Sequence, residues 1–280
     1  MSRPAHLLEH DHEDLPRKQR RERARAERKA LEQAAATGVA RRTRMTQLGI
    51  VLAVVVVGIV VVLLASGESA TIKRIAPETA AARNVTHGIG KLLAGIPQSG
   101  TALGQPTAPV TLQYYGDLEC PVCRAFTIGA LPSIIQKDVR GGELRVEYHS
   151  LQTATREPEV FNSQQLAALA AGKQDKMWNF IETFYHEQGE EDSGYVTESY
   201  IQGIARQVHG LNIAQWTSDR GEDALANQVQ RDAQAASNAG LEGTPAFLLG
   251  RSGGTLRRFQ PSSYTEPGSF EAAIDKLAKA

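Results

Sequence analysis

Residues 110–126 read VTLQYYGDLECPVCRAF, and this short stretch carries three structural signals in succession. Val110–Tyr115 is rich in β-branched and aromatic residues, which favours a β-strand. Gly116–Glu119 turns the chain, and a helix is expected to begin at Cys120–Pro121 because proline is favoured in the first turn of a helix. The sequence therefore predicts a strand, a tight turn and a helix whose first turn carries two cysteines.

The flanking segments extend this pattern into an α/β chain. The first helix should kink at Pro132, and Leu144–His149 alternates as a second strand. Ala246–Leu249 is a short apolar strand, followed by a hairpin turn and a returning strand over 255–260. Helices are expected over residues 160–171, 177–185, 197–208, 224–239 and 270–279, the last with Ser269 as its N-cap. The order predicts a mixed sheet with an inserted helical domain over about residues 155–240.

Cys120 and Cys123 are the only cysteines of the chain. The unpaired N–H groups and the positive end of the helix dipole meet at Cys120, which favours its thiolate, the form that attacks disulfides. Cys123 lies one turn further into the helix and should be more covered. We therefore expect Cys120 to attack, Cys123 to resolve, and exchange to proceed through a mixed disulfide at Cys120. Of the neighbours Glu119, Pro121 and Val122, the glutamate should oppose the thiolate.

Two other roles for the cysteine pair stay open. A zinc site needs four ligands, but no further cysteine and no suitably spaced histidine pair is available, so no metal is expected. A structural disulfide would persist in an oxidising compartment, although so small a ring removes little entropy from the unfolded chain. A tethered binding module with such a fixed bond is the non-catalytic alternative. No cofactor is expected in any of these cases.

Thr244–Pro245 lies more than 120 residues beyond the cysteines, at the start of a predicted strand. A cis bond before proline costs only about 0.5–1 kcal/mol relative to trans. It would expose the Thr244 backbone for pairing with an extended peptide. The Thr244 hydroxyl could also donate to a thiolate. On its own, a proline before a strand is only an allowed edge position, so the value of this pair depends on its combination with the two cysteines.

This combination resembles the thioredoxin superfamily, and within it the membrane-anchored DsbA-like proteins of Gram-positive bacteria. The resemblance covers about Leu92–Lys279 and implies a thioredoxin-like fold. It implies that Cys120 and Cys123 oxidise thiols of substrate proteins, while Thr244 and Pro245 face the active site as the cis-proline loop. The implied partners are exported proteins with cysteines and a quinone-linked membrane re-oxidase of the DsbB or vitamin-K-epoxide-reductase type.

The chain departs from the family pattern beside the cysteines. A well-known periplasmic oxidase has His where this chain has Val122, and Val where it has Thr244. Without that His, Cys120 should be less acidic and the disulfide less oxidising. A change of about 30 mV in a two-electron couple corresponds to about 1.4 kcal/mol, so one side chain can shift the balance between an oxidase and a reductase or isomerase.

A membrane span is predicted upstream of this domain. Met45–Ala65 is 21 residues long and uncharged. About 20 apolar residues in a helix cross the hydrocarbon core of a bilayer. Arg41, Arg42 and Arg44 precede the span, so the positive-inside rule places residues 1–44 in the cytoplasm and the cysteines outside it. A cleaved signal peptide is the alternative, but its apolar region is usually about 7–15 residues long, which favours an uncleaved anchor.

Charge is unevenly distributed along the chain, although the 31 Lys+Arg balance the 31 Asp+Glu. Residues 1–44 hold 12 basic and 7 acidic residues, and residues 67–280 hold the remaining 19 and 24. The basic arm reads as a solvated tail or as a contact for anionic lipid, and a nucleic-acid partner is not expected. The expected parts are the arm (1–44), the span (45–66), a linker and domain edge (67–105) and the thioredoxin-like domain (106–280).

Overall fold

The computed structural model describes residues 80–279. The predicted arm, the predicted span over Met45–Ala65 and the start of the predicted linker lie outside the described residues. Within residues 80–279, no helix combines the length and the apolar character that crossing a membrane requires.

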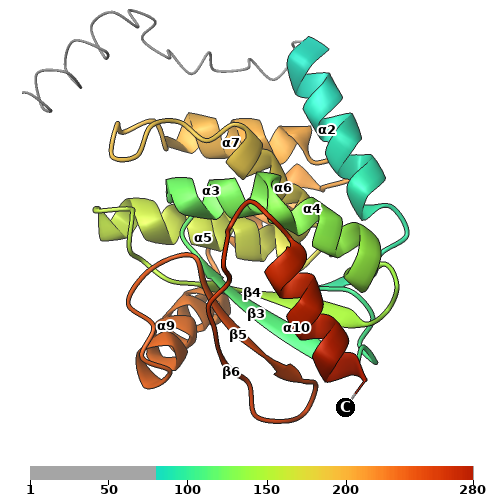
Figure 1. The fold of residues 1–280 in the computed structure, drawn as a ribbon. Coiled ribbons are helices and arrows are strands. Elements are labelled where there is room, and N and C mark those ends of the chain that lie inside the picture. The colour runs from blue at the N-terminus through green and yellow to red at the C-terminus, as the bar shows by residue number, and fades with distance from the viewer. Residues whose placement is uncertain (1–79, 280) are drawn as a thin grey trace, which may run out of the picture. The chain divides into compact units, whose positions relative to one another are not determined.

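One sheet organises the described part of the chain (Figure 1). Its strands are β1 (Gln98–Ser99), β2 (Ala102–Leu103), β3 (Val110–Gly116), β4 (Leu144–Ser150), β5 (Ala246–Arg251) and β6 (Arg257–Phe259). They lie in the order β1-β2-β4-β3-β5-β6. β3 and β4 are parallel, with Val110 opposite Leu144, and the other neighbouring strands are antiparallel. The expected mixed sheet is confirmed, with β3 between β4 and β5, away from both sheet edges.

Side-chain alternation along β3 directs two sets of residues to opposite faces of the sheet. Tyr114 belongs to the large core and packs edge-on against Phe126 of α3 (Pro121–Ile128), with ring centroids 5.0 Å apart. Phe270 of α10 (Gly268–Ala278) joins the same aromatic cluster. Tyr115, the next residue, instead packs with Ala236 of α9 (Asp223–Asn238). Helices therefore cover both faces of the sheet, and β3 is buried along almost its whole length.

Five helices lie between β4 and β5 in the chain: α5 (Pro158–Gly172), α6 (Met177–His186), α7 (Glu198–Gln207), α8 (Ile213–Asp219) and α9. Four of them match segments that the sequence predicts, within three residues at each end. α8 is not predicted, because seven residues are too few for a clear helical period. It forms because the Asn212 side chain caps it and because Trp216 is fully buried, with its Nε1 donating to the Ala167 carbonyl at 2.8 Å.

The first helix breaks at a glycine rather than at the predicted kink site, Pro132. α3 ends at Ile128, and α4 (Ala130–Ile134) and a π-helix, η1 (Ile135–Val139), follow. A Cβ on Gly129 would lie 2.6 Å from the Ala125 carbonyl oxygen and 2.8 Å from Thr265 Cα, so only glycine fits here. Pro132 falls in the first turn of α4, where a missing N–H costs no helical hydrogen bond.

Two expectations, about the first and the last helix of the described residues, differ from the structure. The sequence predicts a linker and domain edge over residues 67–105, whereas the structure has a 14-residue helix there, α2 (Ala80–Leu93). Gly88 and Gly90 each cost about 1 kcal/mol in a helix relative to alanine, but burial of Ile89 and Leu93 in the core stabilises the helix. Ser269 is not the N-cap of the last helix: α10 begins at Gly268, and the Ser269 hydroxyl instead accepts from the Ser262 N–H at 3.2 Å.

Candidate active site

The β3–α3 connection places the two cysteines at the start of a helix. Cys120 is the N-cap of α3, with extended backbone angles, and Pro121 occupies the first turn. The Cys120 N–H donates to the Asp117 carbonyl at 3.0 Å, which closes the turn after β3. The Cys123 N–H donates to the Cys120 sulfur at 3.3 Å. Cys120 therefore uses its sulfur as the capping acceptor, a position that serines and aspartates usually fill with oxygen.

Exposure distinguishes the two thiols, both of which are free in this structure. Cys120 retains 5% of its accessible surface and Cys123 retains none. Val122, between them, is 42% exposed and is the one large hydrophobic residue that stands out as exposed among the described residues. A partner sulfur can therefore approach Cys120, while Cys123 is reachable only from Cys120.

The two thiols have opposite pKa shifts. The hydrogen bond between the side chains of Cys120 and Cys123 is the main factor that lowers the pKa of Cys120, from an ordinary value near 9 to about 6. Burial opposes this, but hydrogen bonds from the Thr244 side chain and from backbone N–H groups of the first turn lower it further. Burial raises the pKa of Cys123 well above its ordinary value, and the adjacent Cys120 adds to the rise. Cys120 is thus the thiolate and Cys123 the protonated thiol near neutral pH.

Thr244 and Pro245 are brought against the cysteines across 124 residues of sequence. The peptide bond between them is cis. The Cys120 sulfur lies 3.4 Å from the Thr244 carbonyl oxygen, to which the thiol donates when it is protonated. The Thr244 hydroxyl also pairs with the hydroxyl of Thr153. Cys120, Cys123, Thr244 and Pro245 therefore lie together, at one end of β3 and β5.

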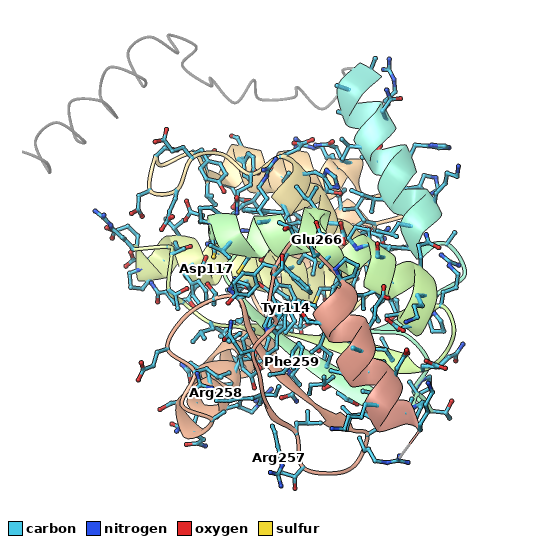
Figure 2. All side chains as sticks on the ribbon, viewed as in Figure 1. Tyr114, Asp117, Arg257, Arg258, Phe259 and Glu266 are labelled. Carbon is cyan, nitrogen blue, oxygen red and sulfur yellow. The ribbon has the colours of Figure 1, made fainter. Side chains whose placement is uncertain are left out.

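Asp117 organises the loops around this site, a role that the sequence does not reveal. Its carboxylate is fully buried and accepts five hydrogen bonds. Three are from the consecutive backbone N–H groups of residues 153–155, at 2.9–3.0 Å. The others are from the Thr155 hydroxyl at 2.6 Å and the Glu119 N–H at 3.1 Å. Because Thr153 contacts Thr244, this carboxylate links the cysteine turn to the cis-proline loop. Figure 2 shows Asp117 near Tyr114.

Tyr185 of α6, and Gln188 two residues after the end of α6, also support the cysteine turn. The Tyr185 hydroxyl donates to the Asp117 carbonyl at 3.1 Å. The buried Gln188 amide donates to the carbonyls of Leu118 and Cys120, at 2.7 and 3.1 Å. These side chains lie about 70 residues further along the chain, so no local signal marks them. Together they satisfy the carbonyl groups of the turn, which holds Cys120 at the helix tip.

Glu119 and Arg124, the charged residues next to the cysteines, differ in exposure. Glu119 is buried, and burial followed by repulsion from Asp117 raises its pKa, while a hydrogen bond with Thr155 opposes this. Arg124 is exposed and donates to the Tyr185 carbonyl at 3.0 Å. Its described contact is therefore with the end of α6.

A small cavity of about 220 Å³ adjoins the cis-proline loop. Thr244 and Pro245 form one side, and Phe247, Arg258 and Tyr264 are among its other lining residues. Figure 2 places Arg257, Arg258 and Phe259 on β6, the strand at this edge of the sheet. The cavity thus combines aromatic side chains with a cationic one next to the cis-proline loop.

A carboxylate cluster elsewhere in the described residues has a geometry that could hold a metal. Ligand atoms of Asp138, Glu143 and Asp275 lie within 4.8 Å of one another. Lys137 Nζ lies 3.7 Å from Asp138 and 3.4 Å from Asp275, so an ammonium group already offsets part of their negative charge. Neither cysteine belongs to the cluster, and no step of the chemistry below uses it.

Comparison with known proteins agrees with this geometry. A family model described as Thioredoxin matches residues 98–258, more than half of the chain. The Probable disulfide bond formation protein D of Bacillus anthracis is 23% identical over 155 residues, which are 53% of this chain and 68% of that protein. The crystal structure of oxidised BdbD from Bacillus subtilis has a TM-score of 0.55 at 19% identity, covering 67% of this chain and 98% of that one. The crystal structure of alpha-DsbA1 from Wolbachia pipientis has a TM-score of 0.54 at 19% identity, covering 67% and 92%.

The chain belongs to the thioredoxin family. The resemblance to DsbA-like proteins is confirmed by the disulfide bond formation proteins among its relatives and by the DsbA-like fold of the solved structures. Within this family, the chain is a thiol:disulfide oxidoreductase.

Proposed function

We propose that the protein introduces disulfide bonds into exported proteins, with Cys120 and Cys123 as its redox-active pair. The observation that carries this proposal is the lowered pKa of Cys120, about 6, next to a Cys123 whose pKa is raised. Stabilising the thiolate stabilises the reduced enzyme, and a disulfide whose reduced form is stable is a strong oxidant. The relatives named as disulfide bond formation proteins support the same direction of electron flow.

In the proposed reaction, a substrate thiolate attacks the Cys120 sulfur of the oxidised enzyme. The Cys120–Cys123 bond breaks, a substrate–Cys120 bond forms, and the Cys123 sulfur leaves and takes up a proton. A second substrate thiolate then attacks the substrate sulfur of this mixed disulfide. The substrate disulfide forms and Cys120 leaves as a thiolate. Two electrons pass from the substrate to the enzyme, and the low pKa of Cys120 makes it the better leaving group in the second step.

The cis-proline loop is the proposed substrate-binding element. Thr244 lies beside Cys120 and precedes β5, so an extended peptide could pair with its backbone while its own cysteine reaches the Cys120 sulfur. The exposed Val122 offers apolar contact on one side of the sulfur. The cavity that adjoins Thr244 and Pro245 offers further surface next to the cis-proline loop. Contacts of this kind suit unfolded chains of varied sequence.

We place this chemistry outside the cytoplasm, on a domain tethered by a single span. The proposal rests on the uncharged stretch Met45–Ala65 and on the arginines before it. The residues before the span form a cytoplasmic arm, and those after it form a linker to the thioredoxin-like domain. Each catalytic cycle leaves Cys120 and Cys123 reduced, so a membrane partner must remove two electrons. By family analogy, this partner is a quinone-linked re-oxidase of the DsbB or vitamin-K-epoxide-reductase type.

The redox potential of the purified chain tests the direction of electron flow. An oxidase should equilibrate with glutathione at a potential near the −120 mV of DsbA, whereas about −270 mV, the level of thioredoxin, would indicate a reductase. A reductase or isomerase is the second candidate, favoured by Val122, which places an uncharged side chain between the cysteines. A domain that fails to exchange with any reduced model protein would instead be a binding module with a structural disulfide.

A further inference from the structure

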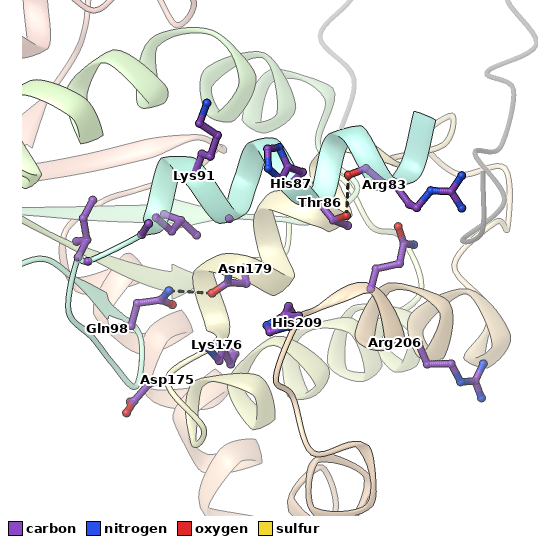
Figure 3. Close-up of a pocket in the computed structure, with 16 residues that line it drawn as sticks. Arg83, Thr86, His87, Lys91, Gln98, Asp175, Lys176, Asn179, Arg206 and His209 are labelled. Carbon is purple, nitrogen blue, oxygen red and sulfur yellow. Dashed lines mark hydrogen bonds between the residues drawn. The ribbon is translucent and has the colours of Figure 1, made fainter. Parts of the chain in front are cut away.

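A second and larger cavity lies on the side of the domain that carries α2. Its volume is about 1040 Å³, at the upper end of the range for small-molecule sites. α2 forms one wall, the Asp175–Asn179 segment at the start of α6 forms another, and the end of α7 with the residues after it forms a third. Figure 3 shows His87 on α2, with Asn179, Lys176 and His209 on the segments across from it. None of the candidate active-site residues lines this cavity.

The charge of the lining is strongly one-sided. Its basic side chains are Arg83, His87, Lys91, Lys176, Arg206 and His209. Asp175 is the one acidic residue among the lining residues that the structure describes. A concave surface lined by charges of one sign concentrates the electric field, which raises the local concentration of counter-ions. The cavity is therefore suited to an anionic ligand.

Three of these cations lack an acidic partner within the described part of the chain. Lys91, Lys176 and Arg206 form no ion pair there, and the described hydrogen bond of Arg206 goes to the neutral Gln202. Two other cations of the domain do form ion pairs. Lys173, three residues before Lys176, pairs with two carboxylates, and Arg220 pairs with Glu198. Lys91, Lys176 and Arg206 are therefore not neutralised by a described carboxylate.

We infer that this cavity binds a phosphate-bearing ligand. A single carboxylate would leave most of the positive charge of the lining uncompensated, whereas a phosphate group carries up to two negative charges and several acceptor oxygens. The basic residues belong to three separate walls, so a ligand with several acceptor oxygens can contact more than one of them. Thr86, Gln98 and Asn179 add neutral polar groups to the lining.

Two kinds of molecule could supply the phosphate group. α2 begins 15 residues after Ala65, the end of the predicted span, so a phospholipid headgroup is within reach of the chain's predicted anchor. A soluble phosphate ester has the same donor requirements. The shared group is the phosphate, and competition between the two forms distinguishes them.

Calorimetric titration of the full chain with sodium pyrophosphate, in zwitterionic detergent at low ionic strength, tests the inference. The key variant carries Lys91→Gln, Lys176→Gln and Arg206→Gln. The matched control carries Arg231→Gln, Arg257→Gln and Lys276→Gln, which removes the same charge from exposed positions outside the cavity. We expect saturable binding that the first triple variant weakens by about tenfold or more, because three charge contacts are lost, and that the control changes by less than about twofold. Thiol exchange by Cys120 should be unchanged in both variants, which reports that they are folded.

Absence of saturable binding, or equal weakening by the two triple variants, would overturn the inference. Equal affinity for malonate, a planar dicarboxylate, would overturn the assignment to phosphate. Displacement of pyrophosphate by short-chain phosphatidylglycerol at lower concentration than by glycerol 1-phosphate would support the inference with a lipid source, and the reverse order would support it with a soluble source.

Discussion

Two regions of this domain bury ionisable side chains, and the pKa falls in one region and rises in the other. At the end of β3, Asp117 has five hydrogen-bond donors, and the Cys120 sulfur receives donors from the first turn of α3. In the interior of α6, Glu182 is 1% exposed, and neither of its carboxyl oxygens has a hydrogen-bond partner. Burial raises the pKa of Glu182 to about 8, whereas the pKa of Cys120 falls to about 6. Burial alone favours the neutral form of an acidic side chain. Burial together with hydrogen-bond donors directed at the side chain favours its charged form.

The same contrast separates the two cysteines within a single helical turn. Cys123 is buried without enough donors, and its pKa rises, as that of Glu182 does. Cys120 stands at the helix tip, where N–H groups have no helical partner. The thiolate therefore depends on where the donors point, and substitutions at the two regions should have effects of different sign and size.

The largest expected effect is on catalysis. Cys120→Ser should reduce the rate of disulfide exchange with a reduced model protein by on the order of 10³ or more, because the attacking sulfur is lost. Cys123→Ala cannot form the internal disulfide, but its Cys120 thiolate should still attack a disulfide of an oxidised substrate protein and release one substrate thiolate. The mixed disulfide that forms has no Cys123 to resolve it, so it should accumulate and be visible on a non-reducing gel. Exchange by Cys120→Ser, or no mixed disulfide with Cys123→Ala, would show that the two roles are wrongly assigned.

The next largest effect is expected for Asp117, whose carboxylate accepts five hydrogen bonds. Asp117→Ala leaves the buried N–H groups of Ala154 and Thr155, and that of the exposed Thr153, without this acceptor, so the free energy of unfolding should fall by roughly 3 kcal/mol. Urea denaturation of the full chain measures this loss. Glu190→Ala, at an exposed loop position, is the control and should change stability by less than about 0.5 kcal/mol. A similar loss in both variants would contradict the linking role of Asp117.

Substitution of Glu182, whose carboxyl oxygens have no hydrogen-bond partner, should change stability in the opposite direction. Glu182→Leu removes a buried polar group without partners, so the free energy of unfolding at pH 8 should rise by about 1–3 kcal/mol.

Its pH dependence follows from the raised pKa. Between about pH 4.5, its ordinary value, and pH 8, the folded chain keeps the Glu182 proton and the unfolded chain loses it. The unfolded chain thus binds fewer protons, so this group lowers stability progressively as pH rises through that window. Glu182→Gln should remove this slope in denaturation curves, and an unchanged slope would show that the group is paired or ionised.

The smallest effect concerns the cis-proline loop. Thr244→Val removes a side-chain hydrogen bond that lowers the pKa of Cys120, so that pKa should rise by less than about one unit and the disulfide should become slightly less oxidising. The pH dependence of iodoacetamide alkylation measures the shift. Thr255→Val, at an exposed position after β5, should leave the alkylation profile unchanged.

The sequence predicts well the features that depend on neighbours in the chain. The β-rich run before Gly116 and the proline after Cys120 predict β3 and the start of α3 within one residue. Gly129 and Pro132 show the limit of such rules. Both can interrupt a helix, and only the approach of Thr265, more than 130 residues away, explains why the break falls at the glycine.

The supporting contacts of the site could not be predicted from the sequence. Asp117 reads as an ordinary turn residue, and its importance comes from a loop 36–38 residues away that presents three N–H groups in a row. Tyr185 and Gln188 occupy a segment whose pattern indicates only core packing. Thr244 was identifiable because its proline and the cysteine pair form a known combination. The carbonyl contact with the Cys120 thiol required the fold.

The titration of Cys120 tests the central claim most directly, because the proposed oxidase chemistry depends on its thiolate. Thiolate absorbance at 240 nm, recorded against pH for the reduced full chain with Cys120→Ser as reference, resolves this group. A midpoint close to pH 6 in the full chain, with rapid alkylation above it, is the predicted result. A midpoint close to 9, the ordinary value for cysteine, would contradict the claim that the donors at the helix tip stabilise the thiolate.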